Sequence, residues 1–199
     1  MSSSTAVLPD GCRDVILKVV GKERPKWFVS PLFDQSKNIY VEGNSKLIGF
    51  RMRPGVEFNE SKLIGCLTSH DVVTDEVESI LDDFTSLDLS VGEALDCLSS
   101  DITSIKQASV RLGVSLRTLQ RLIVNKTGRT PGYWFQLARV RKAGKDLDSA
   151  PCLSCVAEMH GFSDQSHMTR EFQRWFRSTP NKIIKTPELI GQLSDSGYG

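Results

Sequence analysis

Two stretches of the carboxy-terminal half decide the fold: residues 105–127 read IKQASVRLGVSLRTLQRLIVNKT, and residues 153–176 read LSCVAEMHGFSDQSHMTREFQRWF. Each has apolar residues at helical spacing, then a glycine with a serine two positions later, then a second helical pattern. Gly113 and Gly161 mark the breaks, where glycine adopts a left-handed backbone at little cost. The pattern predicts two helix-turn-helix units, each with two helices that cross through a short turn.

The sequence pattern of the same half predicts five helices. We place them at residues 105–112, 116–127, 131–147, 153–160 and 164–176, with a short turn beginning at Pro180. Pro131 opens the middle helix, a position that helices accept in their first turn. That helix would be about 25 Å long at 1.5 Å per residue. A rod of this length can hold two recognition helices about one DNA turn apart, near 34 Å.

The amino-terminal half has a different pattern. Between turn residues, β-branched and aromatic side chains cluster at residues 15–20, 27–29, 39–41 and 47–52, which predicts short strands. Helical spacing then begins at Val73, continues through Phe84 and returns at residues 91–98. We expect an α+β chain with a β-rich domain and acidic helical connector at 1–87, an all-α domain at 88–187 and a carboxy-terminal tail at 188–199.

Charge is segregated along the 199 residues, although the net charge is only +1. Residues 1–100 carry a net charge of −6 and residues 101–199 a net charge of +7. A basic half favours a polyanionic partner, although helix faces exposed to solvent can be basic without one. Residues 63–103 hold ten acidic side chains and no Lys or Arg, so they could fold against the basic half or form a connector that keeps the chain soluble.

Several classes of protein fit the sequence poorly. No apolar run approaches the roughly 18 residues needed to cross a bilayer, and Met1–Thr5 lacks the pattern of a signal peptide, so we expect a cytoplasmic chain. Three histidines make a multi-histidine metal cage improbable. No histidine precedes His70 to serve as a base beside Cys12 or the nearby carboxylates Asp10 and Asp14. We expect no catalytic site, metal or cofactor.

The five cysteines are an odd number in a chain too long to need disulfides, so we expect reduced thiols. The spacing Cys152-x-x-Cys155 also occurs in zinc and redox sites. No second Cys pair or His pair lies at zinc-finger spacing, and Cys155 falls inside a predicted helix. We therefore expect neither a metal nor a redox role for this pair.

Residues 88–187 resemble the DNA-binding domain of the AraC/XylS family of bacterial transcription regulators. The residues that carry the resemblance are Gly113-Val114-Ser115, Leu119-Gln120-Arg121, Thr127-Gly128, Thr130-Pro131, Arg139-Val140, Ala143, Val156-Ala157, Gly161-Phe162-Ser163, Gln165-Ser166, Thr169-Arg170, Phe172 and Pro180. Residues 8–14 and 49–55 also resemble a short amino-terminal domain found in one branch of that family. The resemblance implies a non-enzymatic regulator, bound to double-stranded DNA, with no cofactor.

The sequence departs from the family pattern at five places, namely Ser109, Ile123, Met168, Arg177 and Ile183-Ile184. The family usually has Ala at the first, Phe at the next two, Gly at the fourth, and an aromatic residue followed by Arg at the last. Most of these are core exchanges that cost less than about 1.5 kcal/mol each when shape is kept.

On each recognition helix the apolar face packs inward, so the residues of the other face near the amino-terminal end read the DNA. We expect the DNA-binding residues to be Arg117, Thr118, Gln120 and Arg121 in the first unit and Gln165, Ser166, His167, Thr169, Arg170 and Arg174 in the second. Arg suits guanine and Gln suits adenine in the major groove. The alternative for the arginines is solvation or phosphate contact alone. Phosphate candidates elsewhere are Lys126, Arg129, Lys142, Lys145, Lys182 and Lys185.

The sequence therefore favours a sequence-specific DNA-binding regulator of transcription. RNA polymerase, an effector at the amino-terminal domain, which is a small molecule or a protein, and a second copy of the chain are further candidate partners. The amino-terminal unit would be a sensor, a dimerisation module or a clamp on the DNA-binding half. The alternative function is a protein-interaction module whose helix-turn-helix pair no longer reads DNA. Operator, direction of regulation and oligomeric state have no signal in the sequence.

Overall fold

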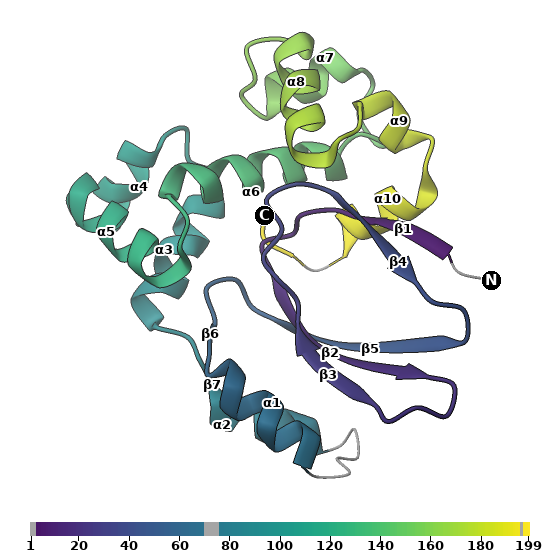
Figure 1. The fold of residues 1–199 in the computed structure, drawn as a ribbon. Coiled ribbons are helices and arrows are strands. Elements are labelled where there is room, and N and C mark those ends of the chain that lie inside the picture. Colours follow the sequence, from purple (N-terminus) through teal and green to yellow (C-terminus); the bar gives the residue numbers. More distant parts are fainter. Residues whose placement is uncertain (1–2, 70–75, 196) are drawn as a thin grey trace.

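The computed structural model describes residues 3–69, 76–195 and 197–199. It has β-strands in the amino-terminal part and helices in the carboxy-terminal part, which confirms the expected α+β class (Figure 1). The elements are β1 (Ser3–Val7), β2 (Arg13–Val20), β3 (Lys26–Val29), β4 (Lys37–Val41), β5 (Ser45–Met52), β6 (Glu57–Phe58), α1 (Glu60–Ser69), α2 (Val77–Phe84), β7 (Thr85–Ser86), α3 (Leu89–Ser99), α4 (Ile105–Arg111), α5 (Leu116–Thr127), α6 (Pro131–Lys145), α7 (Leu153–Met159), α8 (Gln165–Phe176), α9 (Pro180–Ile184) and α10 (Pro187–Ser194).

The strands form three antiparallel groups. The largest has the order β3-β2-β5, in which Val15 of β2 lies between Val29 and Phe50. β1 pairs with β4 in a separate ribbon, and β6 pairs with β7 through two residues each. A small core joins Val15 and Val29 of the sheet to Leu63 and Leu67 of α1 and to helix α2.

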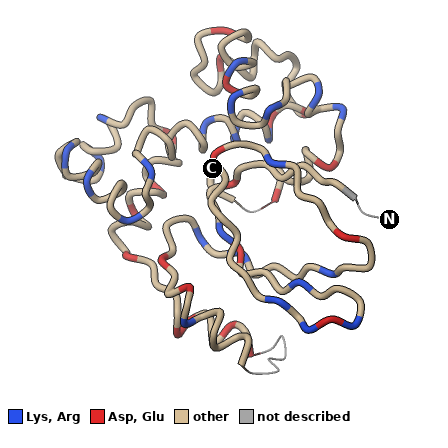
Figure 2. Tube along the Cα trace, viewed as in Figure 1, with Lys and Arg blue, Asp and Glu red and all other residues tan. Residues whose placement is uncertain are grey.

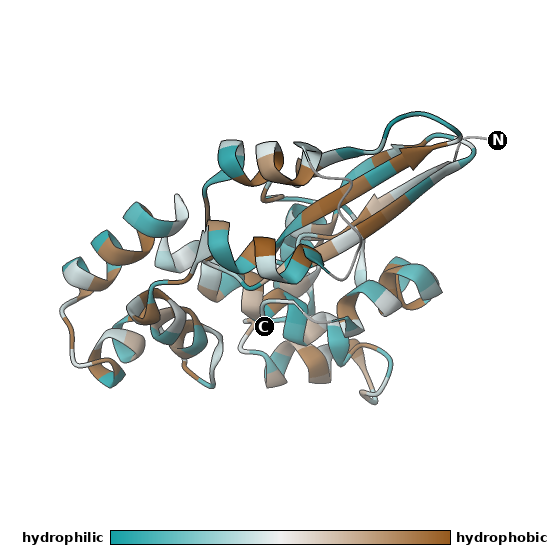
Figure 3. Ribbon diagram, turned by 90° about the horizontal axis from the view of Figure 1, so that it is seen from below, coloured by the Kyte–Doolittle hydropathy of each residue, from teal (hydrophilic) through white to brown (hydrophobic). Residues whose placement is uncertain are grey.

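The main core lies among the helices from α3 to α10, with α6 at its centre. Trp134, Leu137 and Val140 of α6 are almost completely buried. Figure 3 shows how apolar and polar residues alternate along these helices, which is the pattern of helices packed on one face. Leu8, from the segment between β1 and β2, belongs to the same core.

Besides the two-residue strands β6 and β7, three elements of the structure have no counterpart in the sequence-based prediction. Residues 3–7 form β1, α1 occupies residues 60–69, and α10 occupies most of the segment expected to be a tail. α10 is helical because Leu189 and Leu193 bury one face of it, and Leu193 packs on Gly144 of α6. The predicted helical position Val73 and the histidine His70 lie outside the described residues. Within the described ranges, no helix is both long and apolar enough to cross a bilayer.

The expectation of reduced thiols is wrong for Cys152 and Cys155, which form a disulfide. Their Cα atoms are 5.2 Å apart, within the usual range of about 4.4–6.8 Å. Residues three apart at the start of a helix face each other across its first turn, so the pair needs no backbone distortion to meet. Cys12 and Cys97 are free thiols, as expected.

Candidate nucleic-acid interface

Both predicted helix-turn-helix units form, at opposite ends of α6 (Figure 1). α4 and α5 make the first unit and α7 and α8 the second. The glycines that join the paired helices, Gly113 and Gly161, each have φ +67. Among the described residues, no atom lies within 4 Å of the position that a Cβ would take at either glycine. Glycine is therefore favoured there by the left-handed backbone and not by a lack of space.

Side-chain caps fix where each recognition helix begins. The hydroxyl of Ser115 accepts the N–H of Thr118 at 3.1 Å and starts α5. The carboxylate of Asp164 accepts the N–H of His167 at 2.6 Å and starts α8. This cap hydrogen bond holds the pKa of Asp164 below its usual range. Each helix then turns its apolar face inward, with Leu119 buried on α5 and Met168 on α8.

The opposite face of α5 carries the first set of predicted reading residues. Arg117, Thr118, Gln120 and Arg121 are all exposed. Neither arginine has a hydrogen-bond or ion-pair partner within the described part of the chain, so both guanidinium groups are available to a ligand. Thr118 differs from them, because its Oγ1 lies 2.8 Å from the Ser115 hydroxyl and belongs to the cap.

On α8 the predicted residues divide into two groups. Gln165, Ser166 and Arg170 are exposed near the start of the helix. Arg174, one turn beyond Arg170, lies 3.7 Å from the carboxylate of Glu171 and over the ring of Trp175. The first three are therefore free to meet a base edge, whereas Arg174 is held against its own helix.

His167 and Thr169 are half-buried and take part in the turn. Nδ1 of His167 accepts the N–H of Ser163 at 3.2 Å, and its ring meets the edge of Phe162. Thr169 donates its hydroxyl to the carbonyl of Gln165 at 2.9 Å. With Nδ1 used inside the protein, Nε2 is the ring nitrogen that His167 can offer to a ligand.

Lys and Arg residues are spread along α5 and α8 (Figure 2), but most of the predicted phosphate contacts are engaged inside the protein. Lys126 lies 3.1 Å from Glu57 and 3.8 Å from Asp88, and Lys142 lies 3.7 Å from Asp101. The hydrogen bond that Lys126 donates to the carboxylate of Glu57 raises the pKa of Lys126. These acids all precede the first helix-turn-helix unit, so part of the basic charge is neutralised within the chain.

A single loop, residues 30–36, connects the amino-terminal sheet to both units, and we call it the bridging loop. Asp34 binds Arg129, directly after α5, through contacts of 2.7 and 3.0 Å. The carbonyl of Phe33 accepts from the hydroxyl of Tyr133 at 3.4 Å. At the far end of the loop, Ser36 donates its N–H to the carbonyl of Trp175 in α8 at 2.8 Å. The loop therefore touches the carboxy-terminal ends of both recognition helices.

The segment before β2 also contacts α6, which joins the two helix-turn-helix units and which we call the linker helix. Arg141 of α6 is completely buried and donates to the carbonyl of Pro9 at 3.3 Å. Its Nε and Nη2 have no hydrogen-bond partner among the described residues, and burial lowers its pKa. Tyr198 donates its N–H to the carbonyl of Asp10 at 2.8 Å. The bridging loop and these contacts were missed from sequence, because irregular segments that meet across the chain have no periodic signal.

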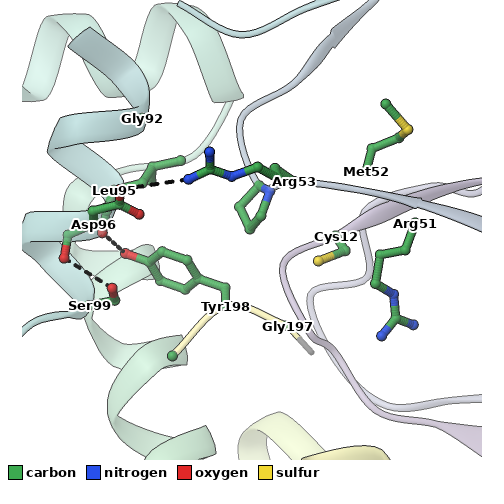
Figure 4. A pocket seen from close by; sticks show the side chains of 12 residues that line it. Cys12, Arg51, Met52, Arg53, Gly92, Leu95, Asp96, Ser99, Gly197 and Tyr198 are labelled. Carbon is green, nitrogen blue, oxygen red and sulfur yellow. Dashed lines mark hydrogen bonds and ion pairs between the residues drawn. The ribbon is translucent and has the colours of Figure 1, made fainter. Parts of the chain in front are cut away.

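A cavity of about 330 Å³ lies where Cys12, just before β2, meets β5, α3 and residues 197–199 (Figure 4). Tyr198 crosses it to donate its hydroxyl to the carbonyl of Leu95 at 2.8 Å, and Arg53 reaches Asp96 at 3.7 Å. Burial raises the pKa of the Cys12 thiol to about 12, so this sulfur is not a thiolate at neutral pH.

Comparisons with known proteins agree with this geometry. Residues 108–186 match the model of a helix-turn-helix domain family. The transcriptional regulator RipA of Corynebacterium glutamicum is 35% identical over 92 residues, which are 46% of this chain and 28% of RipA. The transcriptional activator NphR of a Rhodococcus species is 34% identical over 93 residues, 46% of this chain and 27% of NphR. The chain spans less than a third of the length of these two relatives.

A solved structure from Chromobacterium violaceum, described as a transcriptional regulator with an AraC-type DNA-binding domain, is also similar. It has 23% sequence identity and a TM-score of 0.44, and the match covers 55% of this chain and 96% of that one. The two units on one linker helix make this a double helix-turn-helix protein. Residues 108–186 therefore form a domain that resembles the helix-turn-helix domain family whose model they match.

Proposed function

We propose that this chain is a sequence-specific DNA-binding regulator of transcription that places α5 and α8 in successive major grooves on one face of the duplex. The observation that supports it most directly is the pair of exposed arginines at matching positions, Arg121 and Arg170, on two helices whose other faces are buried. An unpartnered guanidinium group at this place on a recognition helix suits the O6 and N7 atoms of guanine. The names of RipA and NphR, both regulators of transcription, support the same role.

In this proposal the ten predicted residues have different roles. Arg117, Gln120 and Arg121 of α5 and Gln165 and Arg170 of α8 read bases. Thr118 and Thr169 position their helices, since their hydroxyls are used in local hydrogen bonds. Ser166, His167 and Arg174 contact the backbone, which gives orientation without sequence information. Residues 88–187 act as the DNA-binding unit, and residues 1–87 act as a clamp on it through the bridging loop.

A small-molecule effector, if the protein uses one, would fit the cavity beside Cys12 and Tyr198, because that cavity joins the amino-terminal sheet to α3. A second copy of the chain and RNA polymerase are further candidate partners. The rival function, a protein-interaction module, keeps the same fold but makes no use of the exposed arginines.

The deciding experiment selects bound sequences from random duplex DNA at two salt concentrations. Wild type should yield a bipartite motif with half-sites about one turn apart. Arg121→Ala and Arg170→Ala should each relax one half of the motif, at a cost of about 1–3 kcal/mol. Arg24→Ala, at an exposed arginine in the turn after β2, is the matched control and should change nothing. Binding that depends on salt but not on sequence would contradict the proposal and favour the interaction module.

A further inference from the structure

Cys152 and Cys155 lie on the first turn of α7, the first helix of the second helix-turn-helix unit, and their sulfur atoms are bonded. Cys152 is the N-cap of α7, and its sulfur also accepts the N–H of Cys155 at 3.1 Å. Cys152 is exposed and Cys155 is half-buried. Reagents in solution can therefore reach the bond.

The other cysteines provide a contrast. Cys12 and Cys97 are buried, and the thiol of Cys12 has a pKa of about 12. Cys97 lies among core residues, with its sulfur 3.9 Å from the carbonyl of Ala108. Cys66 is half-buried on α1, far along the chain from the pair. Cys152 is therefore the most exposed of the five cysteines.

The local geometry allows both oxidation states. A free thiol at Cys152 can still accept the N–H of Cys155, so α7 keeps its N-cap when the bond is open. The bond encloses only two intervening residues, so it restricts the unfolded chain much less than a bond that closes a long loop. Exposed disulfides are the ones that exchange readily with thiols. These features indicate a reversible bond and not a structural one.

A zinc site is the other use of this cysteine spacing, and the surroundings do not favour it. Structural zinc takes four ligands, usually Cys and His. Among the described residues, no group of three or more His, Cys, Asp or Glu side chains is placed to hold a metal ion. Within those ranges, no third residue of these types joins the two cysteines as a metal ligand.

The position of the pair connects it to the second recognition helix. Val156 and Ala157 follow Cys155 directly and are buried in the core. The carbonyl of Ala157 accepts the N–H of Phe162 at 2.8 Å in the turn that leads to α8. At the other end of α7, His160 lies 2.7 Å from Asp146 after α6. Buried side chains and one backbone hydrogen bond therefore connect the first turn of α7 to the turn that precedes α8.

We propose that Cys152 and Cys155 are a reversible thiol–disulfide site, open to glutathione-class thiols and protein dithiols, that tunes the second helix-turn-helix unit. A reductant thiolate attacks one sulfur and forms a mixed disulfide, and a second reductant thiolate then displaces the protein sulfur. The two cysteines gain two electrons and two protons, and the reductant leaves as its disulfide. The oxidised state fixes the first turn of α7, and the reduced state loosens it. The tuning of DNA binding rests on the proposed function, whereas the chemistry does not.

The chemistry is tested on the folded full chain in a series of glutathione buffers, with iodoacetamide labelling and mass spectrometry. Cys152 and Cys155 should be protected together in oxidising buffer and labelled together in reducing buffer, with a single transition. Cys12 and Cys97 should stay unlabelled throughout. Labelling of the pair in oxidising buffer, or protection that persists in dithiothreitol, would overturn the proposal. Cys66→Ser is the control and should leave the transition unchanged.

The effect on α7 is measured by amide hydrogen exchange without DNA. Reduction of wild type should speed exchange in residues 155–157 at least threefold, whereas Cys152→Ser, which keeps an N-cap hydroxyl, should exchange alike in both buffers. Equal exchange in the two states of wild type would overturn the coupling. With a selected operator, oxidised wild type should bind at least threefold more tightly than reduced wild type, through the half-site read by α8. A chain that shows the exchange difference but binds no DNA would refute the proposed function and leave the thiol site standing.

Discussion

Arg129 and Asp34 are 95 positions apart in the sequence, yet two guanidinium nitrogens meet two carboxylate oxygens at 2.7 and 3.0 Å. Arg129 follows the first recognition helix directly, and Asp34 lies in the bridging loop whose other end contacts α8. The fork-to-fork geometry is the more specific form of an arginine–carboxylate pair. A side chain of the amino-terminal unit therefore contacts the carboxy-terminal half, which contains both helix-turn-helix units.

The first prediction concerns this pair. Asp34→Asn removes the charge and should free the bridging loop, with a loss of unfolding free energy of about 1 kcal/mol or less because the pair is exposed. The larger effect should be on selectivity, because the spacing of the two recognition helices is then less fixed. Affinity measured for operators with one base pair added between the half-sites should fall less in the variant than in wild type. Asp148→Asn, at another exposed carboxylate, should behave like wild type. Identical spacing preferences in Asp34→Asn and wild type would refute the proposed clamp role of the bridging loop.

A second prediction concerns the end of α8. Arg177 has φ +53, a left-handed conformation that glycine adopts at lower cost and that the family usually fills with glycine. Arg177→Gly should raise the free energy of unfolding by up to about 1 kcal/mol, although it gives up the contact with Gln35. Gly128→Ala, at a matching position with φ +67 and open space around it, should lower it by about the same amount. Urea unfolding of both variants checks the pair of signs, and two shifts in the same direction would contradict the backbone explanation.

A third prediction follows from the buried arginine of the linker helix. Arg141 has two nitrogens without a partner in the described part of the chain, so its desolvation is only partly compensated. Arg141→Met keeps most of the volume, and it should leave the free energy of unfolding unchanged or raise it by about 1 kcal/mol. Arg141→Ala should lower it by about 2–3 kcal/mol through the cavity that it leaves. Thermal and urea unfolding give both values, and a large loss in Arg141→Met would show that the charge itself is required.

A fourth prediction concerns pH. The pKa of Asp164 is lowered in the folded protein, so the folded state binds fewer protons than the unfolded state as the group titrates. Its stabilising effect is therefore complete above the ordinary carboxyl pKa of 3.8 and is lost as pH falls through the lower folded value. Asp164→Asn can cap α8 without titrating. The variant should lose less stability than wild type on acidification below about pH 4; parallel curves would place the acid sensitivity elsewhere.

The helices of the carboxy-terminal half could be predicted closely because the residues that mark their ends are local signals in the sequence. Gly113, Gly128 and Gly161 mark helix ends, and Thr130 and Pro131 mark a helix start. α4, α5, α7 and α8 accordingly lie within one residue of the expected bounds. α6 ends at Lys145, two residues early, although Leu147 is still buried.

The remaining elements depend on contacts that a local pattern does not show. β1 is a strand because β4 pairs with it from 30 to 38 residues away. α10 is a helix because Leu193 finds Gly144 on α6. At the candidate interface, the residue types on α5 and α8 could be read from the sequence. The ion pairs of Arg129 with Asp34 and of Lys126 with Glu57 could not be predicted, because they join residues far apart in the chain. The Cys152–Cys155 bond was misjudged because its helix appeared fully explained by its apolar face.

Leu8, Leu189, Leu193 and Tyr198 all belong to the core that surrounds α6. A fragment of residues 88–187 would contain both α5 and α8. It would lack these four side chains and would therefore expose the apolar residues of α6 that they cover. Such a fragment should aggregate unless other apolar side chains replace these four. In this respect it differs from a DNA-binding domain that folds independently and can be fused to other proteins. Because Leu8 packs in this core, a displacement of the segment around Leu8 acts directly on the packing of α6, the helix that joins the two helix-turn-helix units.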